Sequence, residues 1–182
     1  DGGWSAFGCG FSGVIANGLL CNATAILFYA PLVRGPGTPN TIYFGSDRLY
    51  RSADLGVTMP PVSPVLISGQ AITTIAVSPA NDNVRLVGLR NGRLFAVTSA
   101  VGAFVDVTAP TMPAPNPLDP SFRRPVGRAI FHPTDPETAW VAFGGYGVAS
   151  GAHVWKTTAL STGAASWTAS GQGIPDVPVN GL

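Results

Sequence analysis

Residues 72–79 have the sequence Ile-Thr-Thr-Ile-Ala-Val-Ser-Pro, an apolar run that ends on a proline. Two other segments share this character: Thr-Ala-Ile-Leu-Phe-Tyr-Ala-Pro at residues 24–31 and Val-Gly-Arg-Ala-Ile-Phe-His-Pro at residues 126–133. Short apolar runs of this kind are typical of buried strands, and a proline ends a strand because it has no N–H to donate. The three segments therefore predict an internal repeat that begins with a buried strand.

Further strand-like runs follow each of these segments in the same order. The second runs, which end on glycine, are residues 41–45, 84–88 and 139–144. The third runs, in which apolar and polar residues alternate, are residues 48–52, 93–97 and 153–157, and the fourth are residues 57–62, 103–107 and 166–169. Four short strands in a repeat of about 40 to 55 residues is the pattern of a propeller blade. We expect the glycine to permit a positive φ or the close approach of a neighbouring backbone.

The predicted fold class is all-β, a β-propeller with four-stranded antiparallel blades of which about three are present. The predicted parts are a blade remnant at residues 1–23, blades at about 24–71, 72–125 and 126–178, and the start of another blade at residues 179–182. Closed propellers usually have at least four blades. We therefore expect the rest of the ring to come from the same polypeptide or from another chain.

The composition excludes several classes of partner. The chain has 182 residues, of which 46% are hydrophobic and only 10% charged, and its formal net charge is +1. Such a charge gives no electrostatic attraction for nucleic acid or for an anionic membrane surface. The longest apolar run, residues 25–32, is far shorter than the roughly 18 residues that cross a bilayer. We expect no nucleic-acid partner and no transmembrane segment.

The two cysteines, Cys9 and Cys21, lie in a glycine-rich stretch without the additional Cys or His of a zinc site. We favour a local disulfide over the alternative, two free buried thiols. A disulfide implies an extracytoplasmic location, periplasmic or secreted.

Residues 52–59, Ser-Ala-Asp-Leu-Gly-Val-Thr-Met, match the pattern Ser-x-Asp-x-Gly-x-Thr-Trp except at the last position. In such a turn Asp54 accepts backbone N–H bonds, Gly56 supplies an unusual φ, and Ser52 and Thr58 cap the turn. Degenerate copies without the Asp occur at residues 98–104 and 157–167. The motif is interpreted as structural.

On this motif and the four-strand repeat, the chain resembles the Asp-box or BNR-repeat propellers over almost its whole length. Members of that superfamily include sialidases, xyloglucan-cleaving endoglucanases, sortilin-type receptors and photosystem assembly factors. The resemblance implies that the box lies on the outer side of a blade, so that Asp54 is not catalytic. It does not choose among enzymes, receptors and scaffolds.

The acidic residues are the candidates for catalysis, because glycoside hydrolysis normally needs two carboxylates about 5 to 10 Å apart. The acids in predicted turns, where Asp commonly caps backbone groups, are Asp47, Asp82, Asp119, Asp135 and Glu137. Sialidases would also show an arginine triad and a Tyr–Glu pair, and neither is evident in this sequence, which argues against a sialidase site within this segment. His132 and His153 have no second ligand at metal spacing. We predict no catalytic residue, no metal and no cofactor.

The least repeat-like segment, residues 109–125, contains six prolines and joins two predicted blades. Such connections lie at the channel mouth, where propellers usually bind ligands. The binding candidates in this segment are Asp119, Phe122, Arg123 and Arg124; the alternative is a rigid solvent-exposed loop. A second insertion at residues 144–151 adds Tyr146 as a candidate.

The sequence favours a noncatalytic propeller that acts as a binding or assembly module of an extracytoplasmic protein or complex. Its predicted partner is a protein or a polysaccharide. The alternative is a fragment of a secreted glycoside hydrolase, xyloglucanase-like or sialidase-like, whose catalytic residues lie mostly outside this segment.

Overall fold

The computed structural model describes residues 7–8, 10, 15–100, 102–113, 115–116, 119–148, 151–162 and 166–182. For residues 7, 115–116 and 119–123 it describes the backbone alone. Within these ranges the chain is all-β, and the short 3-10 turn η1 (Leu160–Thr162) is the sole helical element. The all-β prediction is confirmed.

Three antiparallel sheets make up most of the molecule, and in each the strands follow one another in chain order. The first sheet contains β3 (Leu32–Arg34), β4 (Ile42–Gly45) and β5 (Leu49–Ser52). The second contains β6 (Ile72–Ser78), β7 (Asn81–Leu89), β8 (Leu94–Val97) and β9 (Val105–Asp106). The third contains β12 (Val126–Phe131), β13 (Ala139–Phe143), β14 (Gly151–Thr157) and β15 (Thr168–Gly171).

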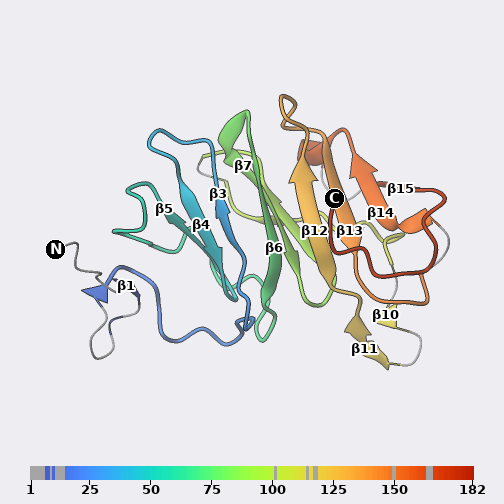
Figure 1. Cartoon of the computed structure of the whole chain (residues 1–182), viewed down its shortest axis with the longest axis horizontal. Coiled ribbons are helices and arrows are strands. Elements are labelled where there is room, and N and C mark those ends of the chain that lie inside the picture. Colours follow the sequence, from blue (N-terminus) through green and yellow to red (C-terminus); the bar gives the residue numbers. More distant parts are fainter. Residues whose placement is uncertain are drawn as a thin grey trace.

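Two small strand pairs accompany these sheets. β1 (Phe7–Gly8) and β2 (Ile15–Ala16) are parallel. β10 (Pro115–Asn116) and β11 (Asp119–Arg123) form an antiparallel pair within the segment predicted to be a loop. This pair lies beyond the end of the third sheet, at the lower right of Figure 1.

The three sheets stand in a row in chain order, with their strands roughly aligned (Figure 1). One apolar cluster, which includes Tyr43, Ile75 and Val87, fills the space between the first and second sheets. A larger cluster, which includes Leu86 and Val141, fills the space between the second and third. The second sheet is therefore covered on both faces, which explains why β7 is buried over its last six residues.

The glycines that end the predicted second strands have a packing role. A Cβ on Gly45 would lie 3.0 Å from Cβ of Ile72, and a Cβ on Gly88 would overlap Val126. Neither glycine is among those with a positive φ. Ile72 and Val126 begin the first strand of the following sheet, so the missing side chain lets one sheet approach the next. Of the two roles expected for the glycine, a positive φ is wrong and close packing is correct. The group that packs against the glycine is a side chain of the next sheet and not its backbone.

The prediction of a strand at residues 24–31 is wrong. That segment contains turns, and its Phe28 and Tyr29 are 94% and 86% exposed. The strand starts after it, with β3, and the carbonyl of Pro31 accepts a hydrogen bond from Gly45 as that of Pro125 does from Gly144. Pro31 therefore precedes a first strand, like Pro125, and does not end one.

The fourth strand predicted at residues 57–62 is reduced to one bridge, between Tyr50 and Pro61. Pro60 and Pro61 have no N–H with which to form a ladder. The other strand predictions for the second, third and fourth runs agree with the sheets. Residues 179–182 form no strand, although Val179 donates to the carbonyl of Phe143 at 3.4 Å, beside the third sheet.

Candidate functional site

The turn after β5 is built around Ser52 and Asp54. The Ser52 hydroxyl accepts the N–H of Gly56 at 2.7 Å and donates to Asp54 at 2.8 Å. Asp54 in turn accepts the N–H and the hydroxyl of Thr58 at 2.8 and 2.7 Å, and these bonds hold the pKa of Asp54 below its usual value. Gly56 has a φ of 95°. Both oxygens of Asp54 therefore accept hydrogen bonds within the turn.

Met59, which stands where the Asp-box pattern has an aromatic residue, is buried. Its N–H donates to the carbonyl of Asn17, and the Asn17 side chain donates to the carbonyl of Gly56. The turn therefore anchors the N-terminal segment to the first sheet. After β14, the Thr157 hydroxyl accepts the N–H of Ala159, much as Ser52 accepts that of Asp54.

The predicted binding residues of the 109–125 segment lie in or directly after β11. Asp119, Phe122 and Arg123 belong to that strand, and their side chains lie outside what the structure describes. Arg124 is buried, and it donates to the carbonyls of Tyr146 and Gly147 at 2.8 and 2.7 Å. The structure thus brings two candidates together, Arg124 and Tyr146, with the Tyr146 side chain exposed.

The loop that carries Tyr146 is held from its other side by Asp176. This carboxylate accepts the N–H groups of Gly147 and Val148 at 2.7 and 3.0 Å, and they lower its pKa. It also lies 3.1 Å from Nε2 of His153, which is fully buried and whose Nδ1 is 3.3 Å from the carbonyl of Phe143. The arrangement fixes the backbone of the loop and leaves the Tyr146 ring free for contact.

A polar cluster between the first and second sheets was not anticipated from the sequence. Asp82, in β7, accepts hydrogen bonds from the Thr41 hydroxyl at 2.5 Å and from the Arg51 guanidinium at 2.7 and 3.0 Å. Its backbone carbonyl accepts from Tyr43 and Arg85. Burial raises the pKa of Asp82, but the bonds from Thr41 and Arg51 outweigh it and keep that pKa below its usual value.

Tyr43 is the buried centre of this cluster. Its hydroxyl accepts from Nε of Arg51 at 3.0 Å, and the Arg85 guanidinium lies 5.2 Å from its ring centroid. Burial raises the pKa of Tyr43, against the opposing charge of Arg85. A cavity of about 340 Å³ lies beside the two arginines and is also lined by Asn83 and Phe104. Tyr43 and Arg51 are neighbours because the strand register pairs them. The position of Asp82 beside them depends instead on how the first and second sheets pack.

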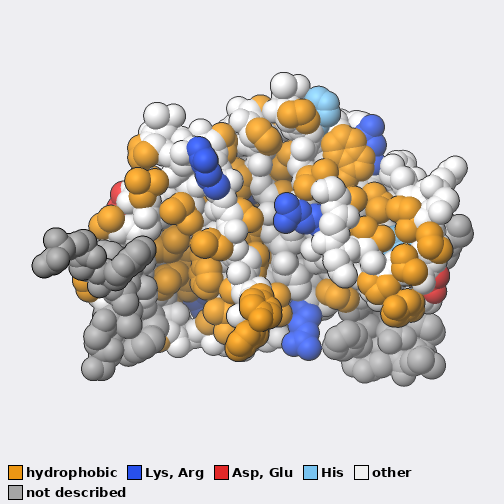
Figure 2. All heavy atoms as spheres, viewed as in Figure 1, with side chains coloured by type: hydrophobic (Ala, Val, Ile, Leu, Met, Phe, Trp, Pro, Cys, Tyr) orange, Lys and Arg blue, Asp and Glu red, His pale blue; other side chains and the backbone are white. Residues whose placement is uncertain are grey.

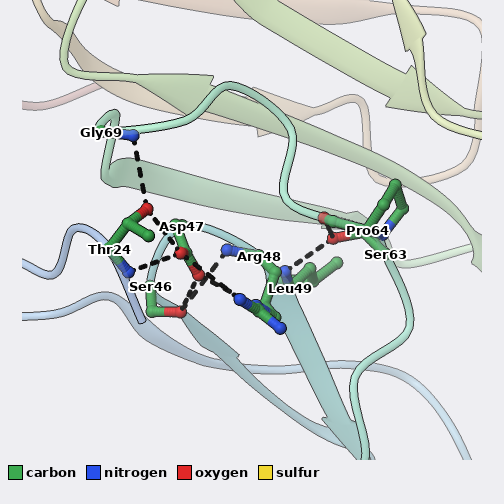
Figure 3. Close-up of polar contacts among 8 residues, drawn as sticks. All are labelled: Thr24, Ser46, Asp47, Arg48, Leu49, Ser63, Pro64 and Gly69. Carbon is green, nitrogen blue, oxygen red and sulfur yellow. Dashed lines mark hydrogen bonds and ion pairs between the residues drawn. The ribbon is translucent and has the colours of Figure 1, made fainter. Parts of the chain in front are cut away.

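The buried carboxylate of Asp47 ties the segment before β3 to the β4–β5 turn (Figure 3). It accepts the N–H and hydroxyl of Thr24 at 2.7 and 2.9 Å, the hydroxyl of Ser46 at 3.1 Å and Nε of Arg48 at 3.0 Å. Burial would raise the pKa of Asp47, but the bonds from Arg48 and Thr24 lower it to about 2. Asp47 is therefore a structural anion.

The remaining acids that the structure describes also form hydrogen bonds or ion pairs within the chain. Asp135 accepts the hydroxyl of Thr138 at 2.6 Å, and this bond lowers its pKa. Glu137 accepts the N–H of Ser161, and Asp106 forms an ion pair with Arg93. Every carboxylate side chain that the structure describes thus has a partner within the chain.

Cys21 is disulfide-bonded, and Cys9, the other cysteine of the sequence, lies outside the described residues. Their pairing stays a prediction. In the described part of the chain, no three His, Cys, Asp or Glu residues are grouped so that they would hold a metal ion. The same part contains no helix with the length and apolar character to cross a membrane. No protein-family model matches the chain, and no curated protein matches it either.

Proposed function

We propose that the three sheets are consecutive blades of a β-propeller and that the chain is a noncatalytic binding and assembly module. The repeated geometry supports the first part. In each sheet, consecutive strands of the chain are neighbours. At the end of the second strand of the first and second sheets stands a glycine, Gly45 or Gly88, and the first side chain of the following sheet packs against it. Meandering sheets that stack in sequence around an axis are the units of propellers.

The noncatalytic role is supported chiefly by the protonation and hydrogen bonding of the carboxyl groups. A glycoside hydrolase needs one carboxyl group held protonated and another free to attack or to activate water. Among the carboxyl groups that the structure describes, the pKa values that depart from the ordinary value are all lowered, at Asp47, Asp54, Asp82, Asp135 and Asp176. These groups remain ionised and are occupied by hydrogen bonds, which supports structural roles.

The surface supports a role in contact with other macromolecules. Hydrophobic side chains cover much of the face seen in Figure 2, and charged side chains on it are few. Phe28 and Tyr29 project from the segment before β3 with their rings edge to face, 4.9 Å between centroids. Exposed aromatic pairs of this kind contribute strongly to binding, because they bury large areas at little entropic cost.

The module is proposed to work outside the cytoplasm. The disulfide of Cys21 supports this location, because disulfides persist in oxidising compartments and are rare in the cytosol.

A hydrolysis assay tests the noncatalytic role. The chain is incubated with xyloglucan and with sialyllactose between about pH 4 and 8, where glycosidase carboxylates work. We expect no release of reducing ends or of free sialic acid above a heat-denatured control. Turnover by the native chain that Asp82→Asn or Asp135→Asn abolishes, while the variants keep their β-sheet circular dichroism, would contradict the proposal.

A further inference from the structure

Arg85, in β7, carries a buried positive charge between the first and second sheets. Only 7% of the residue is exposed, although a guanidinium is always charged in a protein. The strand register places Arg85 in one row with Val77 of β6 and Val97 of β8. A buried charge is costly unless an opposite charge or good hydrogen bonds compensate for it. The partners of Arg85 therefore show whether its charge is balanced.

The partners of Arg85 are electrically neutral groups. Its Nε donates to the backbone carbonyl of Asp82 at 2.7 Å, and its Nη2 lies 3.4 Å from Oδ1 of Asn83. The ring of Tyr43, with its centroid 5.2 Å from the guanidinium carbon, adds a cation–π contact. Among the residues that the structure describes, no carboxylate forms an ion pair with Arg85. Its charge is thus hydrogen-bonded but not neutralised.

The carboxylate of Asp82 is engaged by the first sheet. One of its oxygens accepts the hydroxyl of Thr41, and the other accepts two N–H groups of Arg51. Asp82 therefore forms an ion pair with Arg51 and not with Arg85. The two guanidinium groups and one carboxylate leave a net charge of +1 at this place. One further negative charge would balance it.

The cavity of about 340 Å³ lies against these groups and is lined by Arg51, Asn83 and Arg85. Each of the three side chains has a nitrogen that donates to no described residue: Nη1 of Arg51, Nδ2 of Asn83 and Nη1 of Arg85. In the described part of the chain, every side-chain nitrogen or oxygen that is closed off from solvent has a partner. Nη1 of Arg85 is therefore open to solvent, and the cavity is the open space that this buried side chain lines.

The rest of the cavity wall is apolar and indicates the kind of anion that fits. The residues that complete the wall are Val62, Val97, Ala100, Gly102 and Phe104. Pockets for small organic molecules combine such apolar walls with a few placed polar groups, and they start at about this volume. The planar guanidinium matches the two oxygens of a carboxylate. Phosphate has no apolar part and carries more than one negative charge at neutral pH, so it matches the cavity less well.

We propose that this cavity binds a small monocarboxylic acid with an apolar body. The carboxylate accepts hydrogen bonds from Arg85 and supplies the one negative charge that balances the site, while the body packs against Phe104. Because Arg51 belongs to the first sheet and Arg85 to the second, the bound acid contacts both sheets. The inference goes beyond the proposed function, whose partners are macromolecules that contact the outer surface.

Isothermal titration calorimetry of the wild-type chain with benzoate tests the proposed site. Benzoate, a ring with one carboxylate, should bind saturably at a single site. Benzamide has the same ring without the charge and should bind about tenfold more weakly or less, because hydrogen bonds between charged groups are the stronger ones. Inorganic phosphate should also bind more weakly than benzoate. A lack of saturable benzoate binding, or equal binding of benzamide or phosphate, overturns the inference.

Two variants locate the bound acid in the cavity. Arg85→Met removes the charge and should weaken benzoate binding about 30-fold or more. Asn83→Asp places a carboxylate beside Arg85, where it competes with the ligand, and should weaken binding to a similar extent. Asn83→Asp should not lower the melting temperature, because the new carboxylate balances a buried charge. It therefore tests the site even if Arg85→Met does not fold.

The matched control is Asn180→Asp, which makes the same change of charge at an exposed position beside Gly127 of the third sheet. It should leave benzoate binding unchanged. Benzoate binding that Asn83→Asp leaves at the wild-type level, or that Asn180→Asp weakens as much as Asn83→Asp does, would place the ligand elsewhere and overturn the inference. The hydrolysis assay does not depend on either result.

Discussion

The two contacts between sheets have the same geometry and different chemistry. Between the first and second sheets, the apolar cluster that includes Tyr43 and Val87 is joined at its border by the polar cluster of Tyr43, Arg51 and Asp82. Between the second and third, the centre is apolar, and Trp155 and Trp167 fill it. Hydrogen bonds to a partly buried ion are directional, so they fix how two sheets are aligned, whereas apolar burial gives stability with less dependence on direction. The comparison teaches that sheet stacking here does not depend on one kind of contact.

The largest expected effect is at the apolar contact. Trp155→Ala removes a buried indole together with its 2.8 Å hydrogen bond to the carbonyl of Ala152, and should lower the free energy of unfolding by about 4 kcal/mol. Urea denaturation measures the change. Phe28→Ala, at a position 94% exposed, is the control and should change little. Equal losses in the two variants would show that the apolar contact does not dominate stability.

Close approach of the sheets is tested by adding a single methyl group. Gly88→Ala should cost about 3 kcal/mol, because the new Cβ overlaps Val126. Gly144→Ala should cost far less, because the nearest neighbour of its added Cβ would be 3.5 Å away. Chemical denaturation of both variants gives the difference. A small loss at Gly88 would mean that the second and third sheets can move apart easily.

The polar contact should be weaker than the apolar one. Asp82→Ala leaves Arg51 without its carboxylate, and we expect a loss of about 2 kcal/mol, reduced by solvent because the two side chains are 15% and 28% exposed. The matched control is Arg93→Ala, which breaks the more exposed pair with Asp106 and should cost about 0.5 kcal/mol or less. If Asp82→Ala proves as costly as Trp155→Ala, the ranking of the two contacts is reversed.

Of the two contacts between sheets, acid should weaken the polar one. The pKa of Asp82 is lower in the folded chain than in the unfolded one, so its contribution is complete above the unfolded pKa and is lost as the pH falls through the folded pKa. Stability measured at pH 7 and at about pH 3 should therefore fall less in Asp82→Asn than in the wild type. Asp47, with a pKa of about 2, is present in both proteins, so its contribution to the acid-induced loss of stability is the same in each. Identical falls would indicate that Asp82 adds nothing to acid sensitivity.

The strands inside each sheet were the most predictable part of the fold. Alternation in residues 93–97 and 153–157 indicated β8 and β14, because a half-buried strand needs one apolar face. The start of the first sheet was missed because a proline can follow a strand or precede one, and residues 24–31 contain no residue that decides between the two. A fourth strand of that sheet was predicted in error, because Pro60 and Pro61 cannot donate to a strand ladder.

The candidate site was less predictable, because its contacts join distant parts of the chain. Arg51 and Asp82 are 31 residues apart and meet only when the first and second sheets pack. Asp176 and His153 are separated by a strand and a turn. Local spacing contains no signal for either pair. The ligand-binding roles of Asp119, Phe122, Arg123, Arg124 and Tyr146 stay predictions.

The position of the second sheet has a consequence for how the chain opens. Its strands are paired with near neighbours in sequence, and its two faces support both adjoining sheets. In stacked repeats of this kind, folding stability is a sum of unit terms and nearest-neighbour coupling terms. The second sheet takes part in both couplings and each outer sheet in one. Amide protons of β6 and β7 should thus exchange with solvent most slowly, while the outer sheets open and close in partial excursions that leave this central unit intact.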